Sequence, residues 1–161
     1  MKEKSLSAHG ARALIELLDR TAINDLINRY FCGLDRRDFA LLATCFTPGA
    51  EGRYDGGKKV YSGRDAIVEA MRGIAQFKFS THLMGNTVIE VDKGHATAET
   101  QAVAFLVVDR SAGKGRILVR GLRYVDDLTK GPEGWQISRR VHTPLWQYEG
   151  DSIPPGLPKT D

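Results

Sequence analysis

Cysteine is scarce in this sequence and long apolar runs are absent, and these shortages exclude several classes of protein. The 161 residues contain two cysteines, Cys32 and Cys45, whereas small secreted disulfide scaffolds usually have more. Both lie in apolar helical segments, so we expect free, buried thiols; a disulfide would require the two helices to cross closely. No stretch approaches the ~20 apolar residues of a membrane span, and charges interrupt the first twenty positions, unlike a signal peptide. We therefore expect a cytoplasmic protein with no membrane partner.

A strong charge of one sign is also missing. The net charge is +3, and it is spread along the chain, whereas nucleic-acid binders usually gather Lys and Arg into a stripe. The nearest approach, residues 110–123, reads as a basic strand or hairpin, so we expect no nucleic-acid partner. With 42% hydrophobic and 27% charged residues, the chain can bury one core and is not disordered.

Motifs for metals, phosphates and cysteine nucleophiles are lacking. The histidines are scattered and none forms an HxxxH or HxH pattern. Gly56-Gly57 and residues 113–115 read as turns rather than as phosphate loops. Both cysteines sit among apolar residues, away from a base. We expect neither a metal nor a cofactor.

Helical periodicity dominates the first half of the chain. Apolar residues recur at three- and four-residue steps over residues 11–35, and Thr21 could cap a fresh start, dividing this stretch into helices 11–19 and 22–35. Asp38 is expected to cap a short helix over 39–46, and Asp65 one over 66–76. Between them, Gly56-Gly57 predicts a hairpin within residues 50–62. Residues 1–9 are predicted to be frayed and residues 150–161 to form a loose arm, leaving one domain over 10–149.

Long strands follow in the second half. Residues 79–91, 96–109, 116–127 and 135–147 are rich in β-branched side chains and are separated by glycine-containing turns. This pattern predicts an antiparallel meander of four strands. Helices followed by a meander imply an α+β fold with helices on one face of a bent sheet. Long, twisted strands that curl around a helix form a cone, whose mouth leaves a cavity.

Several short motifs occur in a fixed order along the chain. They are Tyr30-Phe31-Cys32-Gly33-Leu34-Asp35, Asp38-Phe39, Tyr61-Ser62-Gly63-Arg64-Asp65-Ala66-Ile67, Thr81-His82-Leu83-Met84-Gly85-Asn86, Arg123-Tyr124-Val125-Asp126 and Gly134-Trp135-Gln136-Ile137-Ser138-Arg139-Arg140. Together they resemble the SnoaL-like branch of the nuclear transport factor two-like superfamily, over roughly residues 10–150. The resemblance implies a cone-shaped, curved antiparallel sheet wrapped around N-terminal helices, the cystatin-like α+β barrel. The branch includes scytalone and bile-acid dehydratases, a hexachlorocyclohexane dehydrochlorinase, polyketide cyclases and noncatalytic dioxygenase small subunits, so it does not define one chemistry.

The resemblance also implies a catalytic pair. In the dehydratases and the dehydrochlorinase, an Asp near the end of the long helix orients a strand His that acts as general base, and these positions here are Asp35 and His82. The chemistry is sound, because imidazole titrates near neutral pH and a carboxylate on one ring nitrogen fixes the tautomer. A structural His and a helix-end Asp are the alternative. By the same resemblance, Tyr30 and Tyr54 would bind a substrate oxygen, with core packing as their alternative.

Arg140 matches a dehydrochlorinase arginine that reaches the pocket, where it could stabilise an enolate or a departing anion; a surface salt bridge is the alternative. Strict alternation places Ser138, Arg140 and His142 on one face of the last strand and Trp135, Ile137, Arg139 and Val141 on the other. His142 is a candidate pocket residue, and Arg123 is left undecided. The second meander strand lacks the further His or Asp of many dehydratases, which suggests an apolar substrate wall of Met84, Ala102, Ala104 and Phe105.

Two functions remain open from the sequence. The first is a cofactor-free lyase or isomerase of a small hydrophobic, cyclic substrate, in which His82 abstracts a proton (a dehydratase, dehydrohalogenase or cyclase). The second is a noncatalytic ligand-binding or assembly module resembling the small subunit of ring-hydroxylating dioxygenases. In either case the family resemblance implies a homo-oligomer, a dimer or trimer, assembled through the open sheet face.

Overall fold

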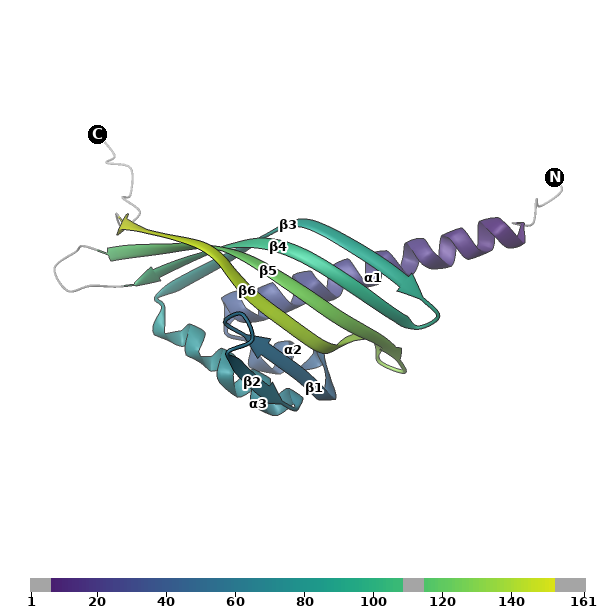
Figure 1. Cartoon of the computed structure of the whole chain (residues 1–161), viewed down its shortest axis with the longest axis horizontal. Helices are drawn as coiled ribbons and strands as arrows, with labels where there is room; N and C mark the ends of the chain where they lie inside the picture. Colours follow the sequence, from purple (N-terminus) through teal and green to yellow (C-terminus); the bar gives the residue numbers. More distant parts are fainter. Residues whose placement is uncertain (1–6, 109–114, 153–161) are drawn as a thin grey trace, which may run out of the picture.

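The computed structural model describes residues 7–108 and 115–152, which form helices followed by one curved sheet (Figure 1). The elements are α1 (Ala8–Arg36), α2 (Phe39–Thr44), β1 (Phe46–Tyr54), β2 (Lys59–Ser62), α3 (Arg64–Met71), the 3₁₀ helix η1 (Arg72–Gln76), β3 (Phe79–Asp92), β4 (His95–Val108), β5 (Gly115–Gly131) and β6 (Gly134–Ser152). The predicted α+β class is confirmed.

The N-terminal helical stretch is one helix rather than two. Ser7 caps α1 by accepting a hydrogen bond from the Gly10 backbone at 3.2 Å. Thr21 does not start a new helix, because its hydroxyl donates to the Leu17 carbonyl one turn earlier, at 2.9 Å. The helix ends at Arg37, whose backbone is left-handed with φ 56°. Residues 8 and 9, which were predicted to be frayed, belong to α1, and residues 1–6 lie outside the described residues.

The first turns of α1 run past the edge of the sheet (Figure 1). Three leucines of the apolar pattern, Leu14, Leu17 and Leu18, are therefore about half exposed. Farther along, Asp19 joins the helix to the sheet by accepting hydrogen bonds from Trp135 Nε1 at 2.9 Å and from Lys130 Nζ at 2.7 Å. From this point α1 lies against the sheet, and Ile23, Leu26 and Ile27 enter the core.

The six strands form one sheet in the order β2-β1-β6-β5-β4-β3. The expected antiparallel meander, β3 to β6, is present, and β1 and β2 form the expected hairpin. β1 also joins the meander by pairing parallel to β6, which no pattern in the sequence indicates. The sheet is curved and remains open, with β2 and β3 at its edges. Residues 150–152 of the expected loose arm belong to β6, and residues 153–161 lie outside the described residues.

Small side chains line the inner face of β4. Ala96, Ala98, Ala102 and Ala104 alternate along the strand and are all buried on the inner face. The opposite face of β4 is polar near His95 and apolar beyond Gln101. The core therefore lies between α1 and the concave face of the sheet.

A bulge in β6 overturns the strict alternation predicted for that strand. Leu128 pairs with Ile137, whereas the preceding Asp127 pairs with Arg139, so Ser138 is an extra residue. The bulge shifts the phase of the strand by one position. Trp135 and Ile137 are consequently buried together with Arg140, rather than facing away from it.

The two cysteines are free thiols in different surroundings. Cys45, at the end of α2, is buried as expected, and burial raises its pKa to about 11. Cys32 is exposed, contrary to expectation, because it lies on the solvent side of α1. No disulfide joins them.

Candidate active site

A cavity of about 220 Å³ opens between α1, the α3–η1 segment and the inner face of the sheet. Its wall is mixed, with polar groups set into an otherwise apolar surface. The polar side chains are Tyr30, Tyr54, Gln76, His82, Arg120, Tyr124 and His142. The apolar ones include Leu34, Met71, Ile74, Phe77, Ala104, Leu106 and Leu122.

Asp35 and His82, which are 47 positions apart in sequence, meet at this cavity. Asp35 Oδ1 lies 2.7 Å from His82 Nδ1, and Asp35 Oδ2 accepts the His82 backbone N–H at 2.7 Å. A carboxylate can only accept hydrogen bonds, so Nδ1 carries the proton. The neutral imidazole therefore keeps the lone pair on Nε2, and no described residue hydrogen-bonds that atom.

The helical period of α1 explains how His82 is held. Phe31 and Asp35 are one turn apart and lie on the same face of α1. The Phe31 ring stacks on the imidazole, with centroids 5.5 Å apart and an angle of 14° between the planes. Tyr30 and Leu34, the adjacent pair at the same spacing, line the cavity instead. The C-terminal end of α1 thus supplies both the residues that hold His82, Phe31 and Asp35, and part of the cavity wall.

Arg37 fixes the end of α1 against β3. Its guanidinium donates to the Phe77 carbonyl at 2.9 Å and to the Ser80 hydroxyl at 2.9 Å. It also donates to the carbonyl of Asp35. These bonds join the residue that follows η1, the start of β3 and the end of α1, so they set where Asp35 stands relative to His82.

The environment of Asp35 keeps it ionised. Partial burial tends to raise the pKa of this carboxyl, but the hydrogen bonds from the His82 side chain and backbone outweigh burial and lower the pKa below its ordinary value. A charged Asp35 next to Nδ1 would also stabilise the imidazolium after a proton is taken up at Nε2.

Tyrosine hydroxyls line the wall near the dyad. Burial raises the pKa of Tyr30, and it raises the pKa of Tyr54 and Tyr124 well above the ordinary value, so all three are neutral at physiological pH. Tyr30 Oη lies 3.6 Å from Met71 Sδ. Tyr54 is near enough to Tyr30 for each hydroxyl to affect the pKa of the other, yet Tyr54 Oη completes no hydrogen bond with a described residue. Neutral hydroxyls of this kind can donate to a substrate oxygen.

Arg140 does not reach the cavity, which corrects the expectation from the sequence. Its side chain is fully buried and forms a two-pronged ion pair with Asp126, with Nε–Oδ1 2.7 Å and Nη2–Oδ2 2.6 Å. The guanidinium carbon lies 3.9 Å from the centroid of the Tyr30 ring and 4.7 Å from that of Tyr124. Because the tyrosine rings separate it from the cavity, Arg140 can act on a ligand only through them.

His142 does line the cavity, and its surroundings keep it uncharged. Burial, followed by the positive charges of Arg140 and Arg120, lowers its pKa from 6.5 to about 4. Its ring lies 5.4 Å from Tyr54 and 5.1 Å from Tyr124, measured between centroids. The extra residue Ser138 shifts the in–out alternation of β6 by one position, so that the His142 side chain points inward.

The expected apolar wall is only partly correct. Ala104 lines the cavity, but Met84 and Ala102, which pair with each other, lie farther along β3 and β4 and pack against the core. Phe105 follows Ala104 directly in β4, so its side chain is on the outer face. Arg123 is exposed on that outer face as well.

Sequence reasoning missed Arg120 and Tyr124 as cavity residues. Both lie on β5, on either side of Leu122, and all three face inward. Period-two alternation along this strand, with Arg123 on the outer face, places them together. The residues from α3 and η1 gave no such signal, because their place depends on how η1 packs over the cavity mouth.

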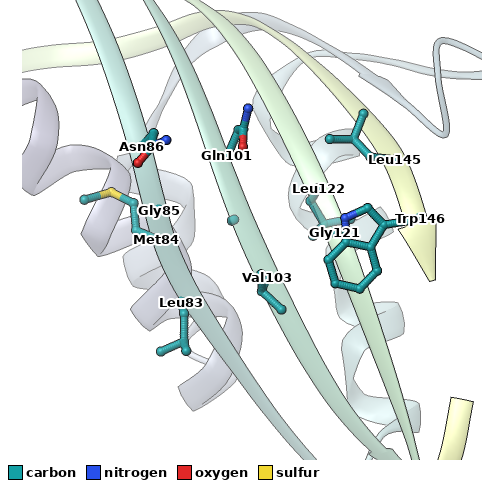
Figure 2. A pocket seen from close by; sticks show the side chains of 11 residues that line it. Leu83, Met84, Gly85, Asn86, Gln101, Val103, Gly121, Leu122, Leu145 and Trp146 are labelled. Atoms are coloured by element: carbon teal, nitrogen blue, oxygen red, sulfur yellow. The ribbon is translucent and has the colours of Figure 1, made fainter. Parts of the chain in front are cut away.

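A second hollow, of about 270 Å³, lies away from the dyad on the outer face of the sheet. Figure 2 shows the indole of Trp146 beside Gly121, with Leu83 and Val103 on neighbouring strands. A Cβ atom at Gly121 would come within 2.2 Å of the Trp146 ring, so only glycine allows the indole to lie there. Leu83, Trp146 and Tyr148 are each more than half exposed.

The described residues contain neither a metal-binding cluster nor a membrane-spanning helix. Within residues 7–108 and 115–152, no group of three or more His, Cys, Asp or Glu side chains could hold a metal ion. No helix in these ranges has the length and apolar character needed to cross a membrane.

The family is defined by a sequence match across most of the chain. Residues 15–141 match the SnoaL-like domain. The chain is also 30% identical over 145 residues to the uncharacterized protein Rv2910c of Mycobacterium tuberculosis, an alignment that covers 84% of this chain and 91% of that protein. The protein belongs to the SnoaL-like family, within the nuclear transport factor two-like fold.

Two solved structures share this fold. A hexachlorocyclohexane dehydrochlorinase, LinA type 2, superposes with a TM-score of 0.77 at 18% identity, covering 90% of this chain and 99% of that one. A protein of Novosphingobium aromaticivorans, provisionally named a scytalone dehydratase, gives a TM-score of 0.72 at 23% identity, covering 83% and 88%. At these identities the likeness describes the fold, and the chemistry depends on the site.

Proposed function

We propose that the protein is a lyase or isomerase in which His82, oriented by Asp35, removes a proton from a carbon atom of a small cyclic substrate. The observation that carries the proposal is the 2.7 Å contact between Asp35 Oδ1 and His82 Nδ1 at the wall of a cavity. That contact leaves Nε2 as the basic atom of the imidazole, available to take up a proton. The fold shared with dehydratase-type proteins supports an enzyme of this general kind.

The reaction is balanced by groups already present. His82 Nε2 takes the proton, and the electrons of the C–H bond form a carbon–carbon double bond. The group on the adjacent carbon leaves with its bonding electrons, either as halide or, when it takes the proton back from His82, as water. Tyr30 and Tyr54, held neutral by burial, would donate to the substrate oxygen on which charge develops. No change of oxidation state is needed, so proton-transfer groups suffice.

The experiment is to measure elimination directly. Purified protein is incubated with scytalone, γ-hexachlorocyclohexane and a panel of β-hydroxy and β-chloro cyclohexanones, while loss of water or halide is followed by NMR. His82→Gln should lower the rate by about 10²–10⁴. Arg123→Gln, on the outer face, is the matched control and should react like wild type. A panel that is inert throughout, or equal rates for wild type and His82→Gln, would contradict the proposal.

Assembly is a second proposal, supported by a different observation. Phe79, Leu83, Trp146 and Tyr148 leave an apolar area exposed on the outer sheet face, and the leucines at the start of α1 are exposed as well. Contiguous apolar surface of this kind is uncommon on monomers and typical of protein contacts. We propose that two or three copies associate through the outer face. A noncatalytic assembly module would need this face and not the dyad, so the elimination assay separates the two functions.

A further inference from the structure

Beyond the dyad, the cavity holds a second set of polar groups. It consists of Arg120 from β5, Tyr54 from β1 and His142 from β6. One buried atom in each, Arg120 Nε, Tyr54 Oη and His142 Nδ1, has no hydrogen-bond partner among the described residues. Buried polar atoms nearly always have partners, and leaving one without costs about 1–3 kcal/mol. Three such atoms around one cavity are therefore the mark of a binding site.

The position of this set relative to His82 follows from the strand register. His82 on β3 pairs with Ala104 on β4, and Ala104 pairs with Arg120 on β5. Neighbouring strands are about 4.8 Å apart, so the Cα atoms of His82 and Arg120 are separated by about 10 Å. The residue between them is an alanine, whose small side chain leaves room for a ligand above it. A six-membered ring fits this gap, with one side toward His82 and the other toward Arg120.

His82, Ala104 and Arg120 form a row across three neighbouring strands, the His82–Arg120 row. The charges at its two ends are opposite. Asp35 brings a negative charge to the His82 end, where it is bonded to the imidazole. At the other end, Arg120 has no ion-pair partner in the described part of the chain, whereas Arg116 on the same strand pairs with Glu149 and Arg140 is neutralised by Asp126. His142, which is uncharged, is near enough for the Arg120 charge to contribute to its lowered pKa. Arg120 is thus a positive charge, without a counterion, in the wall of a partly enclosed cavity.

We propose that Arg120 binds a carboxylate group of the substrate, so that the protein acts on a small cyclic carboxylic acid rather than on a wholly apolar compound. This inference rests on the proposed function for its reaction and names the class of substrate. The planar guanidinium suits a carboxylate, to which it can donate two parallel hydrogen bonds. The carboxylate would be held about one ring width from the carbon that His82 deprotonates.

The test compares two probes of the same shape and different charge. Binding of cyclohexanecarboxylate and cyclohexanecarboxamide is measured by calorimetry at pH 8 and constant ionic strength. The wild type should bind the carboxylate at least tenfold more tightly, as expected for hydrogen bonds to a charged group. Arg120→Gln should lose this preference. Arg123→Gln removes the same charge from the same strand on the opposite face, and should keep it.

Three results would overturn the inference. These are a wild type with no preference for the carboxylate, an Arg120→Gln protein that retains the preference, and an equal loss in Arg120→Gln and Arg123→Gln. If Arg120→Gln does not fold, Arg120→Lys provides the test. Lysine keeps the positive charge but lacks the planar guanidinium with its two parallel donors, so the preference for the carboxylate should fall severalfold. An undiminished preference would contradict a carboxylate site formed by the guanidinium.

His82→Gln separates this inference from the proposed function. It should still prefer the carboxylate, because Arg120 lies on the far side of Ala104 from His82. If the elimination assay fails but the carboxylate preference persists and depends on Arg120, then the proposed chemistry is wrong and the binding site stands.

Discussion

The buried Asp126–Arg140 ion pair makes a quantitative prediction. Both side chains are fully buried and meet through two hydrogen bonds of 2.7 Å and 2.6 Å. Arg140→Met or Asp126→Leu leaves one charge buried without its partner. Breaking such a pair costs about 3–5 kcal/mol, out of a total stability of about 5–15 kcal/mol. Each single variant should therefore fold with clearly reduced stability.

The double variant should behave differently. Replacing both members of a buried pair with apolar groups is often neutral, or stabilising by about 1–4 kcal/mol, because two desolvated charges are removed. Against this, Arg140 lies 3.9 Å from the Tyr30 ring and 4.7 Å from the Tyr124 ring, and each cation–π contact contributes about 0.5–2 kcal/mol. These effects are of similar size, so the double variant should lie within about 2 kcal/mol of wild type.

Urea denaturation of the four proteins at pH 7 measures the cycle. The expected coupling energy between the two positions is larger than about 3 kcal/mol, because the double variant loses much less unfolding free energy than the two single variants combined. A double variant whose loss equals the sum of the two single losses would refute the reasoning, as would single variants that each cost less than about 1 kcal/mol.

Three other residues give predictions. The pKa of His142 is about 4 in the folded protein and 6.5 ordinarily, so the unfolded chain takes up this proton first as the pH falls. The free energy of unfolding of the wild type should therefore fall by up to about 3 kcal/mol between pH 6.5 and pH 4. Urea titrations should show a smaller fall in His142→Gln. Asp35→Asn should lower elimination by about 10²–10⁴ through the wrong imidazole tautomer, and an unchanged rate would argue against the dyad. Trp146→Ser should weaken self-association in light scattering, while Val60→Ser, exposed on β2, should not; equal behaviour would remove the outer face as the interface.

The strands were predictable because their signals are local. Alternating β-branched residues and glycine-containing turns placed the four meander strands, with close agreement at the starts and later ends for β5 and β6. The sequence left open whether the helix at 11–35 divides at Thr21, because a cap and a mid-helix threonine look alike in sequence. Only the position of the Leu17 carbonyl, which the Thr21 hydroxyl contacts, distinguishes them.

Contacts that depend on register could not be predicted. Counting back from the Gly131–Gly134 turn pairs Asp126 with Arg139, and the extra residue Ser138 changes that partner to Arg140. The ion pair, the burial of Arg140 and the inward direction of His142 all follow from this one bulge. Nothing in the alternation of polar and apolar residues reveals it.

The dyad was found through the family resemblance. Asp35 and His82 are too far apart in sequence for any local pattern to join them, and the physical argument only made their pairing reasonable. Their hydrogen bond is now a feature of the structure, whereas their catalytic role stays a prediction. Arg120 could have been assigned to the inner face by alternation alone, but its lack of an ion-pair partner required the fold.

Ala104 makes the evolution of this cavity asymmetric. The residue at the middle of the His82–Arg120 row already has nearly the smallest side chain, so mutation there can fill the space but can hardly enlarge it. A single change to valine or leucine would narrow the range of acceptable ligands while leaving both ends of the row in place. Acceptance of bulkier ligands would have to come from other walls, such as Leu106 or Leu122. Relatives with different substrates should therefore differ at this one position when their ligands are smaller, and at several positions when they are larger.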